Sequence, residues 1–275
     1  MVKIINMKSG GISGQNRIYL DKLSREAKGP VSTVEILNIL GLPAQKGRRM
    51  ILDWVAKGWL TRISKGLYIP VPLGAVSPES RKEDPWIVAS KVFKPCYIGG
   101  WSACEHWGLT DQIFKDMIVF TERRFNASRK EIQGVNYIVK TVSKKYFFGL
   151  NNVWRGPVKI LVSDPAKTIV DILNDPYIGG GIRNISSIIK SYFGSEDRND
   201  TKLLEYLSKH RNRTIYKRLG YLIETLNVQA GEILKKCQDG ISKGYSALDP
   251  DLPAKGKLSR KWNLRINAHI QVNNI

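Results

Sequence analysis

The sequence has few cysteines and no long hydrophobic run. Its three cysteines (Cys96, Cys104 and Cys237) among 275 residues cannot form a disulfide framework and suit a reducing cytosol. No apolar stretch reaches the roughly 18 residues that a membrane span requires, and the start of the chain lacks the apolar core of a signal peptide. We therefore expect a cytoplasmic protein that has no membrane partner.

Acidic residues are also scarce. The chain holds 24 Asp and Glu against 44 Lys and Arg, which gives a formal net charge of +20. Residues 1–82 carry 14 basic and 5 acidic side chains, so this segment is about twice as basic per residue as the rest. Apolar residues still make up 42% of the chain, which argues against disorder. The balance indicates an acidic polymer as partner, although a merely basic and soluble surface would show the same charge.

The N-terminal segment has the element order of a winged helix-turn-helix. Residues 1–16 are rich in Gly, Ser and Lys and lack periodicity, which predicts a flexible leader. Apolar spacing predicts short helices over 17–28, 34–40 and 44–57, and the runs WLTRI and LYIPV predict a β-hairpin. These elements place a winged helix-turn-helix DNA-binding domain at residues 17–74.

The third of these helices and the hairpin carry the predicted DNA-binding residues. In this motif the helix after the turn lies in the major groove, and the hairpin reaches the flanking backbone or minor groove. One face of the helical wheel is apolar and is expected to pack inward, through Gly47, Met50, Ile51, Trp54 and Val55. The other face and the hairpin supply Gln45, Lys46 and Arg49 for base edges, Arg48, Arg62 and Lys65 for phosphates, and Ser64 in the hairpin turn. A solvated basic face and a protein-docking module are the alternative interpretations.

The rest of the chain predicts a linker and a larger domain. Four prolines and mixed charges between Pro70 and Pro85 are typical of an interdomain linker, which we place at residues 75–84. Beyond it, helical patterns alternate with the β-rich runs MIVFTE, NYIVKTV and VKILVSD. Asp164-Pro165 predicts an N-cap followed by proline in the first turn of a helix. The predicted fold class is α/β (α+β), with the winged helix followed by an α/β domain at residues 85–275.

No pattern indicates a catalytic, cofactor or metal site. Cys96, Cys104 and His106 are close in sequence but lack the paired spacing of a zinc site. Gly179-Gly180-Gly181 has no phosphate-loop Lys-Ser/Thr after it, which favours a plain turn. We therefore predict no enzymatic activity, no cofactor and no metal. The alternatives are a nuclease or kinase targeted by the winged helix, and a ligand-sensing regulator with an aromatic pocket in its second domain.

Several segments of the chain occur in an order known from one family. The run GPVSTVEILNILGLPAQKGRRMILDWVAKGWLTRISKGLYIPVP is followed by YIGGWSACEHWGLTDQ, VFTERR, SDPAKTIVDILNDP and KRLGYLIETL. Over roughly residues 17–267 the chain thereby resembles the AbiEi-family antitoxins of abortive-infection toxin–antitoxin systems. The glycine-rich leader and the strongly basic balance depart from the family pattern.

The resemblance implies two activities. One is that of a transcriptional autorepressor, which binds inverted repeats of double-stranded DNA in its own promoter. The other is that of an antitoxin in phage defence, which counteracts a cognate nucleotidyltransferase-like toxin without the need for a stable complex. The resemblance assigns antitoxicity to the second domain.

Overall fold

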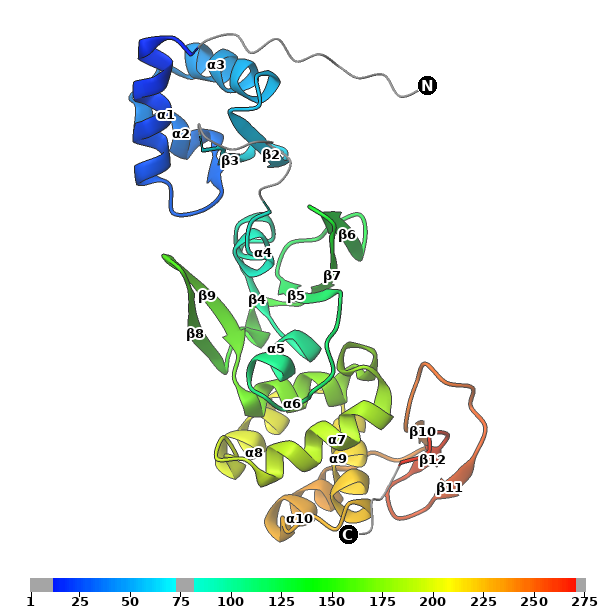
Figure 1. Cartoon of the computed structure of the whole chain (residues 1–275). Coiled ribbons are helices and arrows are strands. Elements are labelled where there is room, and N and C mark those ends of the chain that lie inside the picture. The colour runs from blue at the N-terminus through cyan, green and yellow to red at the C-terminus, as the bar shows by residue number, and fades with distance from the viewer. Residues whose placement is uncertain (1–11, 73–81, 271–275) are drawn as a thin grey trace. The chain divides into compact units, whose positions relative to one another are not determined.

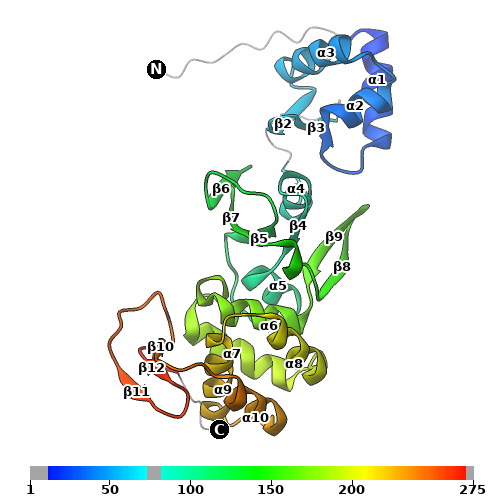
Figure 2. The same cartoon turned by 180° about the vertical axis from the view of Figure 1, so that it is seen from behind.

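A computed structural model describes residues 12–72 and 82–270 of the chain (Figures 1 and 2). The chain divides into two compact units, which are described one at a time. The first comprises residues 1–94, 131–135 and 154–160, and the second comprises the remaining residues. Most of the predicted linker, residues 75–81, lies outside the described part, and the domain boundaries at residues 74 and 85 stay a prediction.

The first unit begins with three helices and a hairpin. Its elements are α1 (Gly14–Glu26), β1 (Val31–Ser32), α2 (Thr33–Leu40), α3 (Ala44–Ala56), β2 (Leu60–Ser64), β3 (Leu67–Pro70) and α4 (Pro85–Val92). The strands form a sheet of order β1-β3-β2, and neighbouring strands run antiparallel. This arrangement confirms the predicted winged helix-turn-helix.

Helix α1 begins earlier than the sequence pattern predicted. The prediction placed its start at Arg17, after a leader over residues 1–16, whereas the helix begins at Gly14. The hydroxyl of Ser13 caps it by accepting a hydrogen bond from the backbone N–H of Asn16 at 3.4 Å. Residues 14–16 therefore belong to a helix and not to a leader, and residues 1–11 lie outside the described part.

Local signals fix both ends of α2. The backbone N–H of Glu35 donates to the Ser32 hydroxyl at 3.2 Å, and the backbone N–H of Ser32 donates to the Glu35 carboxylate at 2.7 Å. These two bonds make a capping box. Gly41 ends the helix with a φ of 62°, a left-handed conformation that glycine adopts without steric cost.

Helices α2 and α3 pack closely at Gly47. A Cβ atom at this position would lie well inside 3.0 Å of Leu37 Cδ2 on α2, so a larger residue would push the two helices apart or displace Leu37. The connecting turn is closed by the backbone N–H of Leu42, which donates to the Leu37 carbonyl at 3.1 Å. The short turn and the glycine contact fix the position of α3 against α2.

The hairpin of β2 and β3 forms the wing, and it is tied to the start of α2. Strand β1 pairs with β3, and the backbone N–H of Thr33 donates to the carbonyl of Gly66 at the hairpin turn at 3.0 Å. The register of the hairpin shifts between Arg62 and Ser64, which is a bulge next to its tip. The module closes around a core of its own, made of Leu20, Leu23, Val31, Ile36, Leu40, Ile51, Trp54, Leu60 and Tyr68.

Beyond α4, a mixed sheet precedes a set of helices. The sheet has the order β6-β7-β5-β4-β9-β8, with bounds Arg129–Ile132, Val135–Thr141, Met117–Thr121, Cys96–Ile98, Val158–Ser163 and Leu150–Arg155. Strand β4 is antiparallel to β5 and parallel to β9, and β5 is parallel to β7. A smaller sheet has the order β10-β12-β11, with bounds Ser246–Ala247, Leu264–Ile266 and Lys257–Ser259.

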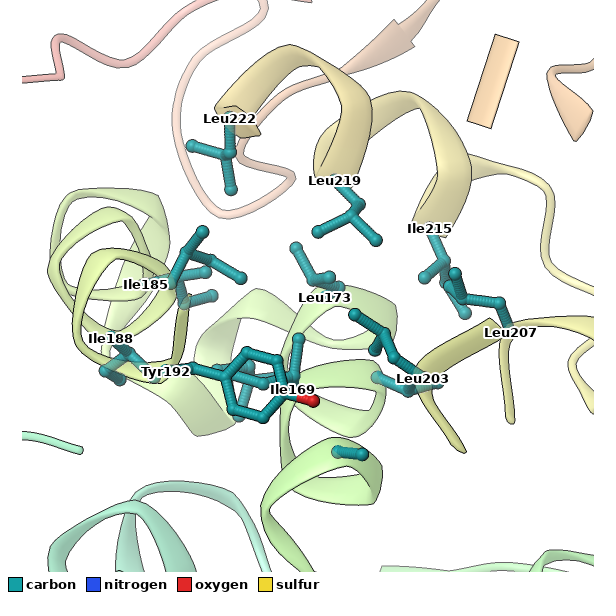
Figure 3. Packing of buried hydrophobic residues seen from close by; sticks show 14 of the residues in the cluster. Ile169, Leu173, Ile185, Ile188, Tyr192, Leu203, Leu207, Ile215, Leu219 and Leu222 are labelled. Atoms are coloured by element: carbon teal, nitrogen blue, oxygen red, sulfur yellow. The ribbon is translucent and has the colours of Figure 1, made fainter. Parts of the chain in front are cut away.

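The helices of the second unit pack around α6. Their bounds are α5 Gly100–His106, α6 Pro165–Asn174, α7 Gly181–Gly194, α8 Asp200–Lys209, α9 Thr214–Thr225 and α10 Gly231–Gly240, with short 3-10 turns at Lys144–Tyr146 and Pro176–Gly179. Asp164 caps α6 and Pro165 occupies its first turn, as predicted. Figure 3 shows Ile169 and Leu173 of α6 packed among apolar side chains of α7, α8 and α9. The larger part of the chain is thus a mixed α/β structure.

Candidate nucleic-acid interface

One face of α3 is buried in the winged-helix module. Gly47, Ile51 and Trp54 are buried, and Met50 and Val55 are half-buried against the core, which confirms the predicted inward face. The indole N–H of Trp54 donates to the side-chain carbonyl of Asn16 on α1 at 3.2 Å. This packing fixes which residues α3 presents to solvent.

The opposite face of α3 is exposed and basic. Gln45, Lys46, Arg48 and Arg49 are all exposed, as the helical wheel predicted. The acidic residue on this face, Asp53, forms an ion pair with Lys57 at 2.8 Å, one turn further along the helix. The carboxylate is therefore compensated by the residue that caps the end of α3 and does not offset the charge of the basic residues before it.

The wing adds two more exposed basic residues. Arg62 and Lys65 are exposed, and Ser64 between them is half-buried. The guanidinium Nε–H of Arg62 donates to the backbone carbonyl of Ser64 at 3.3 Å, across the bulge of β2. This bond holds the Arg62 side chain beside the tip of the wing.

A groove between α3 and the wing brings part of the predicted set together. It is lined by Arg48 and Leu52 of α3 and by Arg62 and Lys65 of the wing, with Thr33, Ile51, Gly66 and Tyr68 at its base. The three residues predicted for phosphate contacts thus lie around one depression. Gln45, Lys46 and Arg49 are not among its lining residues and lie further round the exposed face of α3. Leu52 also lines this groove and is 63% exposed, but the sequence interpretation did not include it.

The charge of this surface is not neutralised within the described part of the protein. In the described ranges 12–72 and 82–270, no ion pair involves any of the five basic residues Lys46, Arg48, Arg49, Arg62 and Lys65. By contrast, Arg25 of α1 pairs with Asp21. We call Lys46, Arg48, Arg49, Arg62 and Lys65 the basic face. Such clustered positive charge attracts polyanions and speeds their encounter with the protein.

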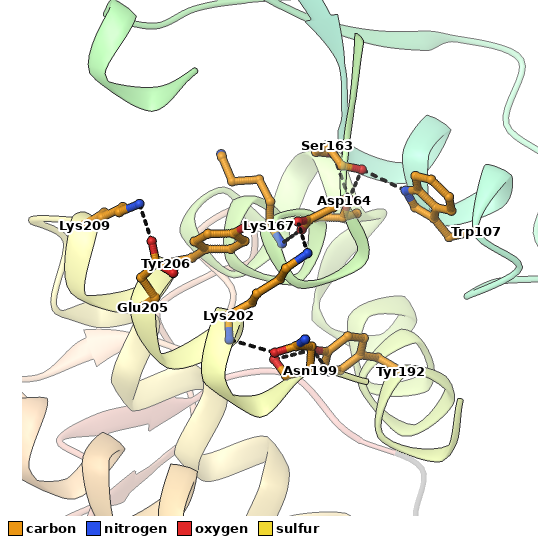
Figure 4. A network of polar contacts seen from close by, with 11 residues as sticks. Trp107, Ser163, Asp164, Lys167, Tyr192, Asn199, Lys202, Glu205, Tyr206 and Lys209 are labelled. Atoms are coloured by element: carbon orange, nitrogen blue, oxygen red, sulfur yellow. Dashed lines mark hydrogen bonds and ion pairs between the residues drawn. The ribbon is translucent and has the colours of Figure 1, made fainter. Parts of the chain in front are cut away.

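The second unit contains a buried polar network that has a structural role. The ammonium of Lys167 is fully buried and forms an ion pair with Asp171 one turn further along α6, while the Tyr97 hydroxyl donates to Asp171 at 3.3 Å. The Tyr206 hydroxyl donates to Asp164 at 3.0 Å, at the start of α6 (Figure 4). Burial raises the pKa of Asp171, and the adjacent Lys167 opposes that shift. The network satisfies these polar groups inside the core and orders α6.

Residues considered for other chemistry have structural partners. Cys104 is buried in the core, and burial raises the pKa of its thiol, which makes it unreactive. Among the described residues, no three His, Cys, Asp or Glu side chains gather as a metal ion would require. The glycine run reaches the start of α7, where the Asp249 carboxylate accepts a hydrogen bond from the backbone N–H of Ile182 at 3.0 Å. A side chain thus occupies the helix end that a phosphate would need.

Three helices, a tight turn and a basic wing define a winged helix-turn-helix of the kind found in DNA-binding regulators. Residues 19–71, from α1 to the end of the wing, match the family model described as "Transcriptional regulator, AbiEi antitoxin". The match confirms the resemblance for this module. No curated protein matches the chain. In the described part of the chain, no helix combines the length and apolar character that a bilayer crossing demands.

Proposed function

We propose that the protein is a cytoplasmic repressor that binds inverted repeats of double-stranded DNA in its own promoter. The observation that carries this proposal is the basic face, because α3 and the wing present five basic residues that no carboxylate of the described chain neutralises. The family model matched by the same residues describes transcriptional regulators. In this role α3 lies in the major groove and the wing follows the flanking backbone.

The proposal divides the exposed residues by role. Gln45, Lys46 and Arg49 read base edges from the first turns of α3, where a bidentate contact discriminates by about 1–3 kcal/mol. Arg48, Arg62 and Lys65 hold phosphates, with Ser64 beside them, and their common groove supports this assignment. Phosphate contacts fix the position of a protein on DNA and carry no base information of their own.

The division of roles is tested by two matched substitutions. Arg49→Ala should weaken binding to the promoter duplex by about 1–3 kcal/mol and leave binding to a random duplex much less affected, because a base contact is lost. Arg62→Ala should weaken binding to both duplexes about equally. Fluorescence anisotropy at one fixed salt concentration measures all four affinities.

Arg25→Ala is the control for these substitutions. Arg25 lies on α1, outside the basic face, and pairs with Asp21 there, so its loss should leave both affinities nearly unchanged. Equal loss of promoter and random binding in Arg49→Ala would show that Arg49 is not a base-reading residue. A chain that binds the promoter no better than random DNA would refute the proposed repressor.

We also propose that the protein is an antitoxin against a nucleotidyltransferase-like toxin, and that it acts without enzymatic activity, cofactor or metal. The AbiEi description of the matched family and the ordered segments in the second unit support this part. A full-length variant with Arg48, Arg49 and Arg62 all changed to Ala separates the two activities. If the second unit carries antitoxicity, this variant should lose promoter binding and still protect cells that co-express the toxin from a separate promoter. Loss of protection in a variant that folds normally would mean that DNA binding accounts for the antitoxin effect.

A further inference from the structure

Leu52 is a large apolar side chain in the middle of a charged surface. It is 63% exposed and belongs neither to the core of the module nor to the half-buried side chains packed on it. Ile18 and Val34 are exposed to a similar degree elsewhere on the module, at 62% and 65%. Single exposed apolar residues are common in proteins, so exposure alone does not distinguish Leu52. Its neighbours do.

Leu52 lies on the same side of α3 as the proposed DNA-reading residues, further along the helix. An α-helix turns by about 100° per residue, so Leu52 lies only about 20° round the helix from Gln45 and about 60° from Arg49. Arg48 lies one turn before it and lines the same groove. Leu52 lies about one turn beyond Arg48 and Arg49 on the same side of α3, so a duplex that extends along this side of the helix from Arg49 to the wing also covers Leu52.

The charge of this surface limits what the ligand can be. The residues around Leu52 select a polyanion, and on the edges of DNA bases in the major groove the apolar group is the C5-methyl of thymine. An amino group of cytosine or adenine placed against Leu52 would lose its hydrogen bond to water without a replacement, which disfavours those bases. A thymine methyl group placed against Leu52 has no hydrogen bond to lose, and the contact removes apolar surface of both groups from water.

We infer that Leu52 is a specificity-determining residue that contacts the C5-methyl group of a thymine, so that each operator half-site carries a T·A pair at this position. The inference rests on the proposed function, because it requires α3 to lie in the major groove. It adds an apolar contact to a recognition surface whose other members are polar or charged.

The test removes the methyl group and nothing else. The full chain first selects its preferred duplex from a random double-stranded library. Each thymine of that duplex is then replaced in turn by deoxyuridine, and binding is measured by fluorescence anisotropy. One thymine in each half-site should show about fourfold weaker binding, which corresponds to roughly 0.8 kcal/mol for one buried methyl group. In Leu52→Ala the same replacement should have no effect, because the partner of the methyl group is gone.

The outcomes distinguish a failure of this inference from a failure of the proposed function. Lys57→Ala, with its paired ammonium outside the basic face, should keep the fourfold effect. A selection that yields no preferred duplex would refute the repressor and this inference together. A preferred duplex without any thymine sensitive to deoxyuridine would overturn the inference alone, as would a fourfold effect that persists in Leu52→Ala or vanishes in Lys57→Ala. Circular dichroism of both variants verifies that the exposed substitutions leave the fold intact.

Discussion

The uncompensated charge of the basic face determines how steeply DNA affinity should fall with salt. Each phosphate neutralised by a basic side chain releases counterions and contributes about −0.9 to the slope of log K against log salt concentration. Three residues of the basic face, Arg48, Arg62 and Lys65, are assigned to phosphates, so the predicted slope is about −2.7 for one bound module. Between 50 and 200 mM salt, this slope corresponds to a loss of affinity of about 40-fold.

Two substitutions of single cations locate the origin of the slope. Arg62→Gln removes a cation of the basic face and should make the slope shallower by about 0.9. Arg25→Gln removes a cation that lies on α1, outside the basic face, and is paired with Asp21, so the slope should stay as in the unmodified chain. Anisotropy titrations of a short single-site duplex at a series of KCl concentrations measure the slopes.

The electrostatic reasoning would be refuted in two ways. A slope near −1 would mean that most of the residues assigned to phosphates do not contact them. An equal change of slope in Arg62→Gln and Arg25→Gln would mean that net charge, and not the position of the charge, controls binding. Repeating the titrations on a random duplex should give nearly the same slopes, since phosphate contacts do not depend on sequence.

Three further predictions concern the second unit. Lys167→Met should destabilise the fold by about 3–5 kcal/mol in urea unfolding, because it leaves the buried Asp171 carboxylate without its cation. Gly220→Ala should cost about 1–3 kcal/mol in the same assay, because a Cβ atom there would overlap the ring of Trp262. Burial, with Lys167 nearby, lowers the pKa of His210 from 6.5 to about 4, so its contribution to stability should be present above pH 6.5 and be lost as the pH falls toward 4. An NMR titration should find this imidazole neutral down to about pH 5.

Each of these predictions has its own control. The double substitution Lys167→Met with Asp171→Leu should recover most of the lost stability, since no buried charge is left unpaired. Gly194→Ala, at a position where a Cβ atom would meet nothing within 4 Å, should change stability little or raise it slightly. His210→Gln should remove the His210 part of the pH dependence. An unchanged pH slope in that variant would contradict the assignment to His210.

Local patterns predicted much of the fold because many signals here are local. The Asp164-Pro165 start of α6, the inward face of α3 and the hairpin of β2 and β3 all appear in the structure at the expected places. Other elements were missed, namely helix α10, the three-residue strand β4, and β8, a largely exposed strand at the edge of its sheet. Their positions depend on tertiary contacts that a single sequence does not display.

Local patterns likewise predicted one part of the candidate site and not the other. Helical periodicity placed Gln45, Lys46, Arg48 and Arg49 on the exposed face of α3, because the buried face is defined by residues within the same helix. The groove that joins Arg48 to the wing depends on the β1–β3 pairing and on the bulge of β2, which no local pattern predicted. Leu52 had one available signal: it interrupts the polar arc of the helical wheel. An apolar residue within the polar arc of such a helix should be counted among the candidate contact residues, as a charged residue is.

The pairing of β1 with the wing affects whether the protein or the DNA changes shape on binding. Because the residue that caps α2 also pairs with β3, and the Gly66 carbonyl accepts the backbone N–H of Thr33, the distance from the reading helix to the wing tip is set before any ligand arrives. Such a preformed surface loses little conformational entropy on binding. It also has little capacity to adjust to a duplex of the wrong shape. Variation in groove width between operators must then be absorbed by the DNA, so bases between the contacted positions should influence affinity through the stiffness of the duplex.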